Sequence, residues 1–230
     1  MSPPRVALIL HGCGVYDGTE CTEAVGAIVA LSRAGALIEM YACDKPQMHV
    51  VNHLTGSPVD GEVRNVLVES ARIARGNIKD ISEIDVDAFD AIFFPGGFGA
   101  AKNLSNFAVA GPDLEVDPQV EEVIKSFLSQ KKVLGFSCIA PIIAAKVIPG
   151  VKISFGMGEG DKFPHAGAVG AAEKLGATHV NMSPPCNGAV VDEINRVVTC
   201  VGYMYDGSPH EIFDSMVAGV EKVLDLVTEE

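Results

Sequence analysis

Short apolar runs alternate with amphipathic segments along most of the chain. Residues 5–10 (RVALIL), 37–42, 91–94 (AIFF), 132–136 and 151–155 have the continuous apolar character of strands that are buried on both faces. Between and after these runs, apolar residues recur at helical spacing in 22–34, 65–75, 118–130, 139–147, 165–175 and 208–227. Strands that alternate with helices predict an α/β fold, with a mostly parallel sheet covered by helices on both faces.

Turn and cap residues sharpen this picture. Asp117 precedes Pro118, which is the pairing expected at the start of a helix. Residues 189–192 and 196–200 flank a turn at Asn195 and predict a small β-hairpin. Residues 43–62 and 96–116 follow neither period, so we expect long irregular stretches there. With no internal repeat or linker in the sequence, residues 1–230 are predicted to form a single domain.

Composition excludes several classes of protein. The 230 residues are 48% hydrophobic and 20% charged, which is typical of a globular chain. A net charge of −13 disfavours nucleic acid and anionic membranes as partners. No apolar run approaches the ~18–20 residues that a membrane helix needs. The first residues, MSPPRVALIL, lead almost directly into a strand, so we expect a cytoplasmic protein; the alternative is a mitochondrial protein whose transit peptide is absent from this sequence.

The cysteine pattern argues against metal and disulfide scaffolds. The six cysteines, at positions 13, 21, 43, 138, 186 and 200, include no CxxC pair, so neither a zinc ribbon nor a thioredoxin motif is indicated. We expect reduced thiols, no metal site and no cofactor. Cys13 and Cys21 could come near Cys138, but the sequence leaves open whether either pairs with it.

Cys138 carries the sharpest chemical signal, because it stands where the run VLGFS ends and a helix is expected to begin. A strand that turns directly into a helix exposes one residue at its apex, as in a nucleophile elbow. Free N–H groups at the helix start favour a thiolate and can hold an oxyanion, with the Ile139 amide as the natural donor. The alternative is a buried cysteine that only packs.

Other candidates gather at the carboxyl ends of the predicted strands, where functional loops of an open α/β sheet meet. Glu23 could share a proton with Cys138, or it could be a solvated helix-start residue. The segment PGGFG, with Gly96 and Gly97, allows close backbone approach to a ligand or is merely a tight turn; it is not a GxGxxG nucleotide motif. The remaining pocket candidates are His11, Gly12, Cys13 and His165.

Several segments together resemble a known family. They are GCGVYDGTE (12–20), NHLTG (52–56), ESARIARG (69–76), PGGFGAAKNLSNFA (95–108) and CIAP (138–141). In these the chain resembles the class I glutamine-amidotransferase-like superfamily, which includes the parkinsonism-associated deglycase and intracellular proteases. Within it, the chain is similar to the ElbB-type glyoxalases (enhancing lycopene biosynthesis) and their eukaryotic mitochondrial relatives.

The resemblance implies a flavodoxin-like three-layer sandwich, commonly a homodimer. It places Cys138 on the family's elbow cysteine, Glu23 on the glutamate that contacts it, and Gly97 and Ile139 on the oxyanion-hole amides. The implied activity is conversion of glyoxal-type dicarbonyls, such as glyoxal, to hydroxy acids such as glycolate without a cofactor. The implied partner is a small carbonyl substrate.

The sequence also departs from the superfamily pattern. Ile139 stands where the proteases have a histidine after the cysteine, and Gly156 where other members carry a histidine. Thr22 replaces the usual histidine of the branch. A Cys–His triad is therefore not expected unless His11 or His165 supplies it from an unusual position. Two alternatives stay open: a redox sensor that is oxidised at Cys138, and a cysteine-dependent hydrolase or amidase.

Overall fold

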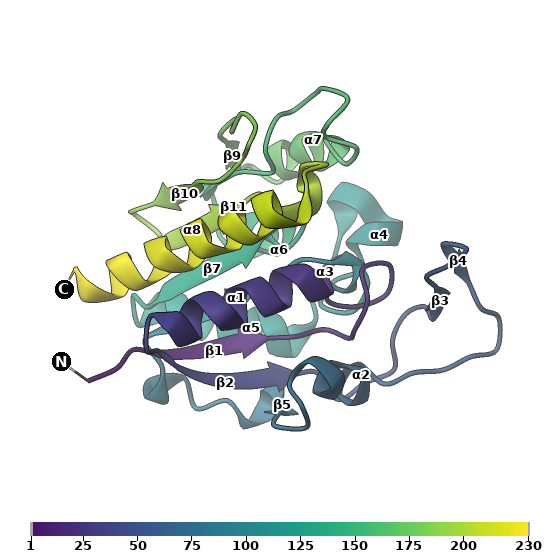
Figure 1. Ribbon diagram of the computed structural model, residues 1–230, viewed down its shortest axis with the longest axis horizontal. Helices are drawn as coiled ribbons and strands as arrows, with labels where there is room; N and C mark the ends of the chain where they lie inside the picture. Colours follow the sequence, from purple (N-terminus) through teal and green to yellow (C-terminus); the bar gives the residue numbers. More distant parts are fainter. Residues whose placement is uncertain (1, 230) are drawn as a thin grey trace.

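The computed structural model describes residues 2–229 and is built around a seven-stranded sheet (Figure 1). The strand order is β10 (Ala189–Asp192), β11 (Val197–Cys200), β7 (Val133–Ser137), β6 (Ala91–Phe94), β1 (Arg5–Ile9), β2 (Leu37–Ala42) and β5 (Lys79–Asp80). All neighbouring pairs are parallel except β10 and β11, which form an antiparallel hairpin. The predicted α/β, flavodoxin-like arrangement with a mostly parallel sheet and a small hairpin is confirmed.

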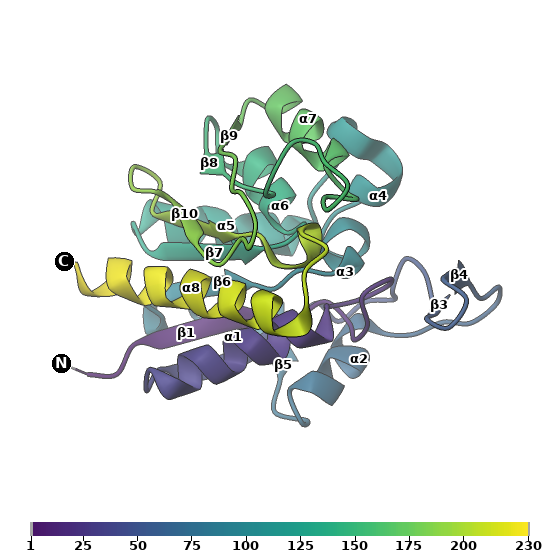
Figure 2. The same cartoon turned by 45° about the horizontal axis from the view of Figure 1, so that its top comes forward.

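Helices cover both faces of this sheet (Figures 1 and 2). One face carries α1 (Cys21–Arg33), α2 (Val66–Ile73) and α8 (Pro209–Thr228). The other carries α5 (Pro118–Ser129) and α6 (Pro141–Val147), with α7 (Gly167–Lys174) packed on α6. Alternate residues of β1 supply the two cores: Val6 and Leu8 pack toward α1 and α8, whereas Ala7 and Ile9 pack toward the opposite face.

Local sequence signals explain where the helices begin. Asp117 caps α5 by accepting a hydrogen bond from the Gln119 amide, as the Asp-Pro pair predicts. Glu20 caps α1 in the same way, and its side chain accepts from the amide of Glu23 at 2.8 Å. This second cap fixes the orientation of the first turn of α1, which carries Glu23.

The predicted strand over residues 151–155 is wrong in its placement. Only β8 (Lys152–Ile153) is extended there, and it pairs with β9 (Thr178–His179) in a separate two-stranded parallel sheet. The position beside β7 in the main sheet is taken by β11. β8 is instead tied to the hairpin by side chains, since the Lys152 amide donates to Asp192 and the Ser154 amide donates to Thr199.

The two stretches expected to be irregular contain short elements. Residues 43–62 include the antiparallel pair β3 (Val51–Asn52) and β4 (Ser57–Pro58), which projects from the body of the molecule (Figures 1 and 2). Residues 96–116 include α3 (Phe98–Lys102) and α4 (Phe107–Ala110). Short 3₁₀ turns, η1 (Ile81–Glu83), η2 (Val86–Ala88), η3 (Gly111–Asp113) and η4 (Gly202–Met204), complete the connections. Between residues 2 and 229, no helix has the length and apolar character to cross a membrane.

Candidate active site

Cys138 occupies the turn between β7 and α6, as predicted. Its φ of +56° lies in the left-handed region, which is costly for a residue with a side chain. The turn is held by the Cys138 amide, which donates to the Cys200 carbonyl at 3.0 Å. α6 begins at Pro141, so the helix starts two residues later than the pattern predicted. The side chain of Cys138 is 7% exposed and lines a cavity.

Glu23 lies behind this cysteine and is fully buried. Its Oε2 accepts hydrogen bonds from the Gly96 amide and the Ser137 hydroxyl, both at 2.9 Å, and its Oε1 accepts from the Tyr203 amide at 2.9 Å. Three strand ends, those of β6, β7 and β11, therefore converge on one carboxyl group. The solvated glutamate considered as an alternative is wrong, because no part of this side chain meets solvent.

The thiol and the carboxyl compete for a proton. Burial raises the pKa of Glu23 from 4.5 to about 7, against the lowering effect of its hydrogen bonds. Burial also raises the pKa of the Cys138 thiol well above its ordinary value, and the charge of Glu23 raises it further. The expected lowering of the thiol pKa is therefore wrong, although the amides of Gly97 and Ile139 do favour the thiolate. Protonation of Glu23 removes the repulsion between the two groups.

The glycines of the PGGFG turn are required by close packing. A Cβ atom on Gly96 would lie 2.3 Å from the Cys138 Cβ and 2.6 Å from the Glu23 Oε2, so no side chain fits between these two residues. Gly97 has a φ of +106° and lies beside the backbone of residues 18–20. Its amide and that of Ile139 both act on the Cys138 sulfur, which is the arrangement expected of oxyanion-hole donors.

The cavity in front of Cys138 has a volume of about 1160 Å³. Its wall includes Gly97, Phe98 and Lys102 from the PGGFG segment and α3, and Tyr203 from the turn after β11. The projecting β3–β4 segment contributes further lining residues, so this exposed arm forms one side of the cavity. The Lys102 ammonium donates to the Tyr16 carbonyl at 2.7 Å and lies 5.5 Å from the centre of the Phe98 ring.

His11 does not line this cavity. It is fully buried, its Nε2 lies 2.9 Å from the Pro95 carbonyl oxygen, and burial lowers its pKa to about 4. A neutral ring donates through Nε2 to that carbonyl and packs under Gly99. His11 therefore supports the PGGFG turn from behind instead of contacting a ligand.

Gly12 and Cys13 also lie outside the cavity wall. The Gly12 amide donates to the Ser70 hydroxyl at 2.8 Å. Gly12 has a φ of +109°, a backbone conformation that favours glycine over residues with a side chain. The Cys13 sulfur lies 3.8 Å from that of Cys21. The three candidates from the end of β1 thus shape the loop next to the site without reaching Cys138.

His165 does line the cavity. It is exposed, and its ring meets the Phe98 ring edge-to-face with centroids 5.5 Å apart. This places an imidazole in the cavity wall, on the loop that precedes α7. The hydrogen bonds to the Glu23 carboxyl come from Gly96, Ser137 and Tyr203, so His165 is not the group that orients it.

The sequence interpretation gave no role to several residues of the site. Ser137 and Tyr203 hydrogen-bond Glu23, while Glu20 and His49 line the cavity. Tyr203 was detectable in principle, because β11 is a parallel strand and its carboxyl end reaches the same edge as β7. His49 comes from an irregular loop whose path no sequence pattern indicates; its Nδ1 is buried without a hydrogen-bond partner.

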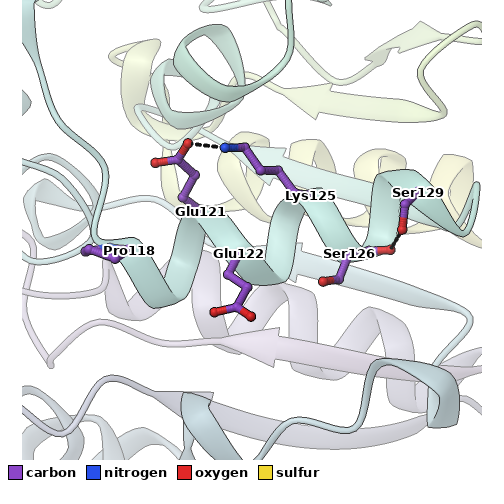
Figure 3. Close-up of a pocket in the computed structure, with 6 residues that line it drawn as sticks. All are labelled: Pro118, Glu121, Glu122, Lys125, Ser126 and Ser129. Atoms are coloured by element: carbon purple, nitrogen blue, oxygen red, sulfur yellow. Dashed lines mark hydrogen bonds and ion pairs between the residues drawn. The ribbon is translucent and has the colours of Figure 1, made fainter.

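The hollow along α5 is separate from this site, and it has a different lining. Within residues 2–229, no cluster of three or more His, Cys, Asp or Glu side chains is placed to hold a metal ion. A second hollow, of about 580 Å³, lies along α5 (Figure 3). Its polar lining includes the ion pair of Glu121 and Lys125, and it shares no residue with the cavity beside Cys138.

Comparison with known proteins places the chain in a family. No family model matches it. It is 51% identical over 224 residues to the ES1 protein homolog, mitochondrial, of Rattus norvegicus, covering 96% of this chain and 84% of the relative. It is equally similar to the human glutamine amidotransferase-like class 1 domain-containing protein 3, mitochondrial, covering 96% and 83%.

A solved structure agrees with these relatives. The isoprenoid biosynthesis protein with amidotransferase-like domain from Ehrlichia chaffeensis superposes with a TM-score of 0.88 at 35% identity, covering 98% of this chain and all of that one. The expectation of a cytoplasmic protein is wrong, because curated relatives that are half identical are mitochondrial proteins. By fold and by sequence, the chain belongs to the class I glutamine-amidotransferase-like superfamily, alongside the mitochondrial ES1 proteins.

Proposed function

We propose that this protein is a cofactor-independent glyoxalase or deglycase-like enzyme that converts small reactive dicarbonyls, such as glyoxal, to hydroxy acids. One observation carries the proposal: a buried carboxyl with a pKa of about 7 lies beside a cysteine at a strained turn. A carboxyl that gains and loses a proton near neutral pH is suited to move protons during a reaction.

The first step uses the proton shared by the pair. Cys138 transfers its proton to Glu23, and the sulfur adds to one aldehyde carbon of glyoxal, forming a hemithioacetal. The amides of Gly97 and Ile139 stabilise the negative oxygen that this addition creates. Neutralisation of Glu23 at the same moment removes the charge repulsion that otherwise opposes the thiolate.

The second step moves a hydrogen between the two carbons. Glu23, ionised again after giving its proton to the new oxygen, removes the hydrogen from the carbon bonded to sulfur. It then returns a proton to the neighbouring carbon, and the hydroxyl proton of the first carbon passes to the oxygen of the second. The first carbon thereby becomes the thioester carbonyl and the second its CH₂OH group. Water attacks this thioester, the carbon–sulfur bond breaks, and glycolate leaves with the thiol restored. No electrons are exchanged with an outside group, which fits a site that needs no cofactor.

The hydrolase alternative is less well supported by the site. A cysteine hydrolase uses a histidine base beside the thiol, whereas the group beside Cys138 is Glu23, and His11 is occupied with Pro95. The sensor alternative needs a thiol that oxidants reach readily. Cys138 is 7% exposed and its pKa is raised, which opposes rapid oxidation.

The test is turnover by the purified protein of glyoxal, methylglyoxal and phenylglyoxal, with the hydroxy acid measured by NMR. The larger aldehyde belongs in this panel because the cavity exceeds the size of glyoxal many times. We expect Cys138→Ala and Glu23→Gln each to reduce kcat by at least about a thousandfold. Cys186→Ala and the exposed Glu173→Gln serve as matched controls and should keep wild-type rates. Turnover that survives in either site variant contradicts the roles assigned here.

A further inference from the structure

Two cysteines lie together at the start of α1, outside the cavity wall. The sulfur atoms of Cys13 and Cys21 are 3.8 Å apart. Cys21 is exposed and Cys13 is half-buried, whereas the other four cysteines of the chain are buried. Among the six thiols, these two are therefore the ones that a reagent in solution reaches most directly.

The loop between β1 and α1 brings the two thiols together by folding back on itself. The Gly14 amide donates to the Thr19 carbonyl at 2.9 Å, and the Gly18 amide donates to the Gly14 carbonyl at 2.8 Å. Cys13 also forms an isolated β-bridge with Thr19, which lies two residues before Cys21. The chain between the two cysteines is thus already closed into a compact loop, so joining them needs no long segment to be ordered.

Gly18 keeps this loop tight. A Cβ atom at this position would lie 2.4 Å from the Cys13 amide nitrogen and 2.6 Å from the Gly12 carbonyl carbon. Any side chain at residue 18 must therefore push residues 12 and 13 away. A disulfide has an S–S distance of about 2.05 Å, so the two sulfurs need to approach by roughly 1.8 Å from their separation of 3.8 Å.

We propose that Cys13 and Cys21 are a redox-active dithiol, which hydrogen peroxide converts to a reversible intrachain disulfide before it oxidises Cys138. One thiol first attacks the peroxide, breaks the O–O bond and becomes a sulfenic acid, and one water leaves. The second thiol then displaces the sulfenic oxygen as a second water while the S–S bond forms. Two thiol hydrogens and two electrons pass to the peroxide, so the balance closes.

The surroundings of Cys21 affect the protonation of its thiol. Burial raises the pKa of Cys21 to about 12, and the adjacent charge of Cys13 adds to this effect. Cys21 therefore stays protonated at neutral pH, and the same disulfide forms whichever of the two thiols attacks the peroxide first. This chemistry does not rest on the proposed carbonyl turnover, since neither thiol lines the cavity.

The chain offers a direct readout. The first two tryptic cleavage sites are Arg5 and Arg33, so one peptide, residues 6–33, contains Cys13 and Cys21 and no other cysteine. The purified full chain, as wild type and as Cys138→Ala, is treated with a few equivalents of hydrogen peroxide and then alkylated under denaturing conditions. We expect peptide 6–33 to lose about 2 Da and to take up no alkyl group. After reduction with dithiothreitol it should take up two, while Cys138 in the same wild-type sample stays alkylatable.

Four variants sharpen the test. Cys13→Ser and Cys21→Ser should each abolish the mass loss, whereas Cys186→Ser should leave it unchanged. Gly18→Ala, which keeps both thiols, should lower the disulfide yield several-fold because it opens the loop. The proposal is overturned if peptide 6–33 still takes up two alkyl groups at a peroxide dose that oxidises Cys138. It is also overturned if the cross-link found joins two chains, or if Gly18→Ala forms the disulfide as readily as the wild type.

Discussion

Replacing Glu23 with glutamine tests whether the ionised Glu23 carboxylate destabilises the folded protein. An unfolded glutamate has a pKa of 4.5, and burial raises the folded value to about 7. The folded state therefore holds the proton more tightly, and ionisation of Glu23 costs folding free energy as the pH rises from 4.5 to 7. Each pKa unit corresponds to about 1.4 kcal/mol. Between pH 5 and pH 8 the wild type should thus lose about 2 to 3 kcal/mol of stability from this group.

Glutamine does not ionise, so the Glu23→Gln variant should not lose this folding stability between pH 5 and pH 8. Its amide nitrogen must face one of the donors from Gly96, Ser137 or Tyr203, which costs about 1 kcal/mol at every pH. The variant should therefore be slightly less stable than the wild type at pH 5 and more stable at pH 8. Urea unfolding at both pH values measures this, with the exposed Glu173→Gln as control. A stability difference between variant and wild type that stays constant within about 0.5 kcal/mol across this range refutes the reasoning.

Three further predictions concern the groups around the pair. Gly96→Ala forces a methyl group against Cys138 and Glu23. It should abolish turnover and lower the free energy of unfolding in urea by about 3 kcal/mol, whereas Gly170→Ala, with open space around it and outside the cavity wall, should have little effect. Equal effects of the two substitutions contradict this packing. His11 has a folded pKa of about 4, below its unfolded value of 6.5, so the protein should lose about 3 kcal/mol of stability as the pH falls from 6.5 to 4. In urea unfolding over this pH range, His11→Gln should show a smaller loss than the wild type. Lys102→Met should raise KM for dicarbonyls that carry a carboxylate more than for phenylglyoxal, and equal changes for both would argue against a binding role.

Much of the fold could be predicted from the sequence, because long buried strands leave a clear pattern. β1, β6 and β7 are continuous apolar runs that neighbouring helices cover on both faces, and the observed bounds agree within a residue or so. The strands β3, β4, β5, β8 and β9 have two residues each, which is too short for any periodicity to appear. Val151, Ile153 and Phe155 are buried apolar residues, yet none of residues 151–155 lies in the main sheet.

The site was predictable where the fold rule brings strand ends together. Cys138 and the PGGFG turn follow adjacent strands of the sheet, β7 and β6, so their meeting followed from the alternation of strands and helices. The pKa of the thiol was not predictable, since it depends on how deeply the turn is buried and on the charge of Glu23. His11 ends a strand at the same edge, but its ring turns inward to Pro95, and strand position alone does not reveal this. The homodimer and the single-domain organisation implied by the sequence stay predictions.

The most direct test of the central claim is to trap the bound aldehyde on Cys138. Glu23→Gln keeps the thiol but lacks the group that takes its proton and then moves the hydrogen. A thiol still adds to an aldehyde slowly when water takes its proton, so with glyoxal the variant should accumulate an adduct of one glyoxal per chain in intact mass spectra. Peptide mapping should place this adduct on Cys138, and Glu23→Gln combined with Cys138→Ala should show none. An adduct that forms equally without Cys138, or a Glu23→Gln variant that releases glycolate at the wild-type rate, would contradict the account.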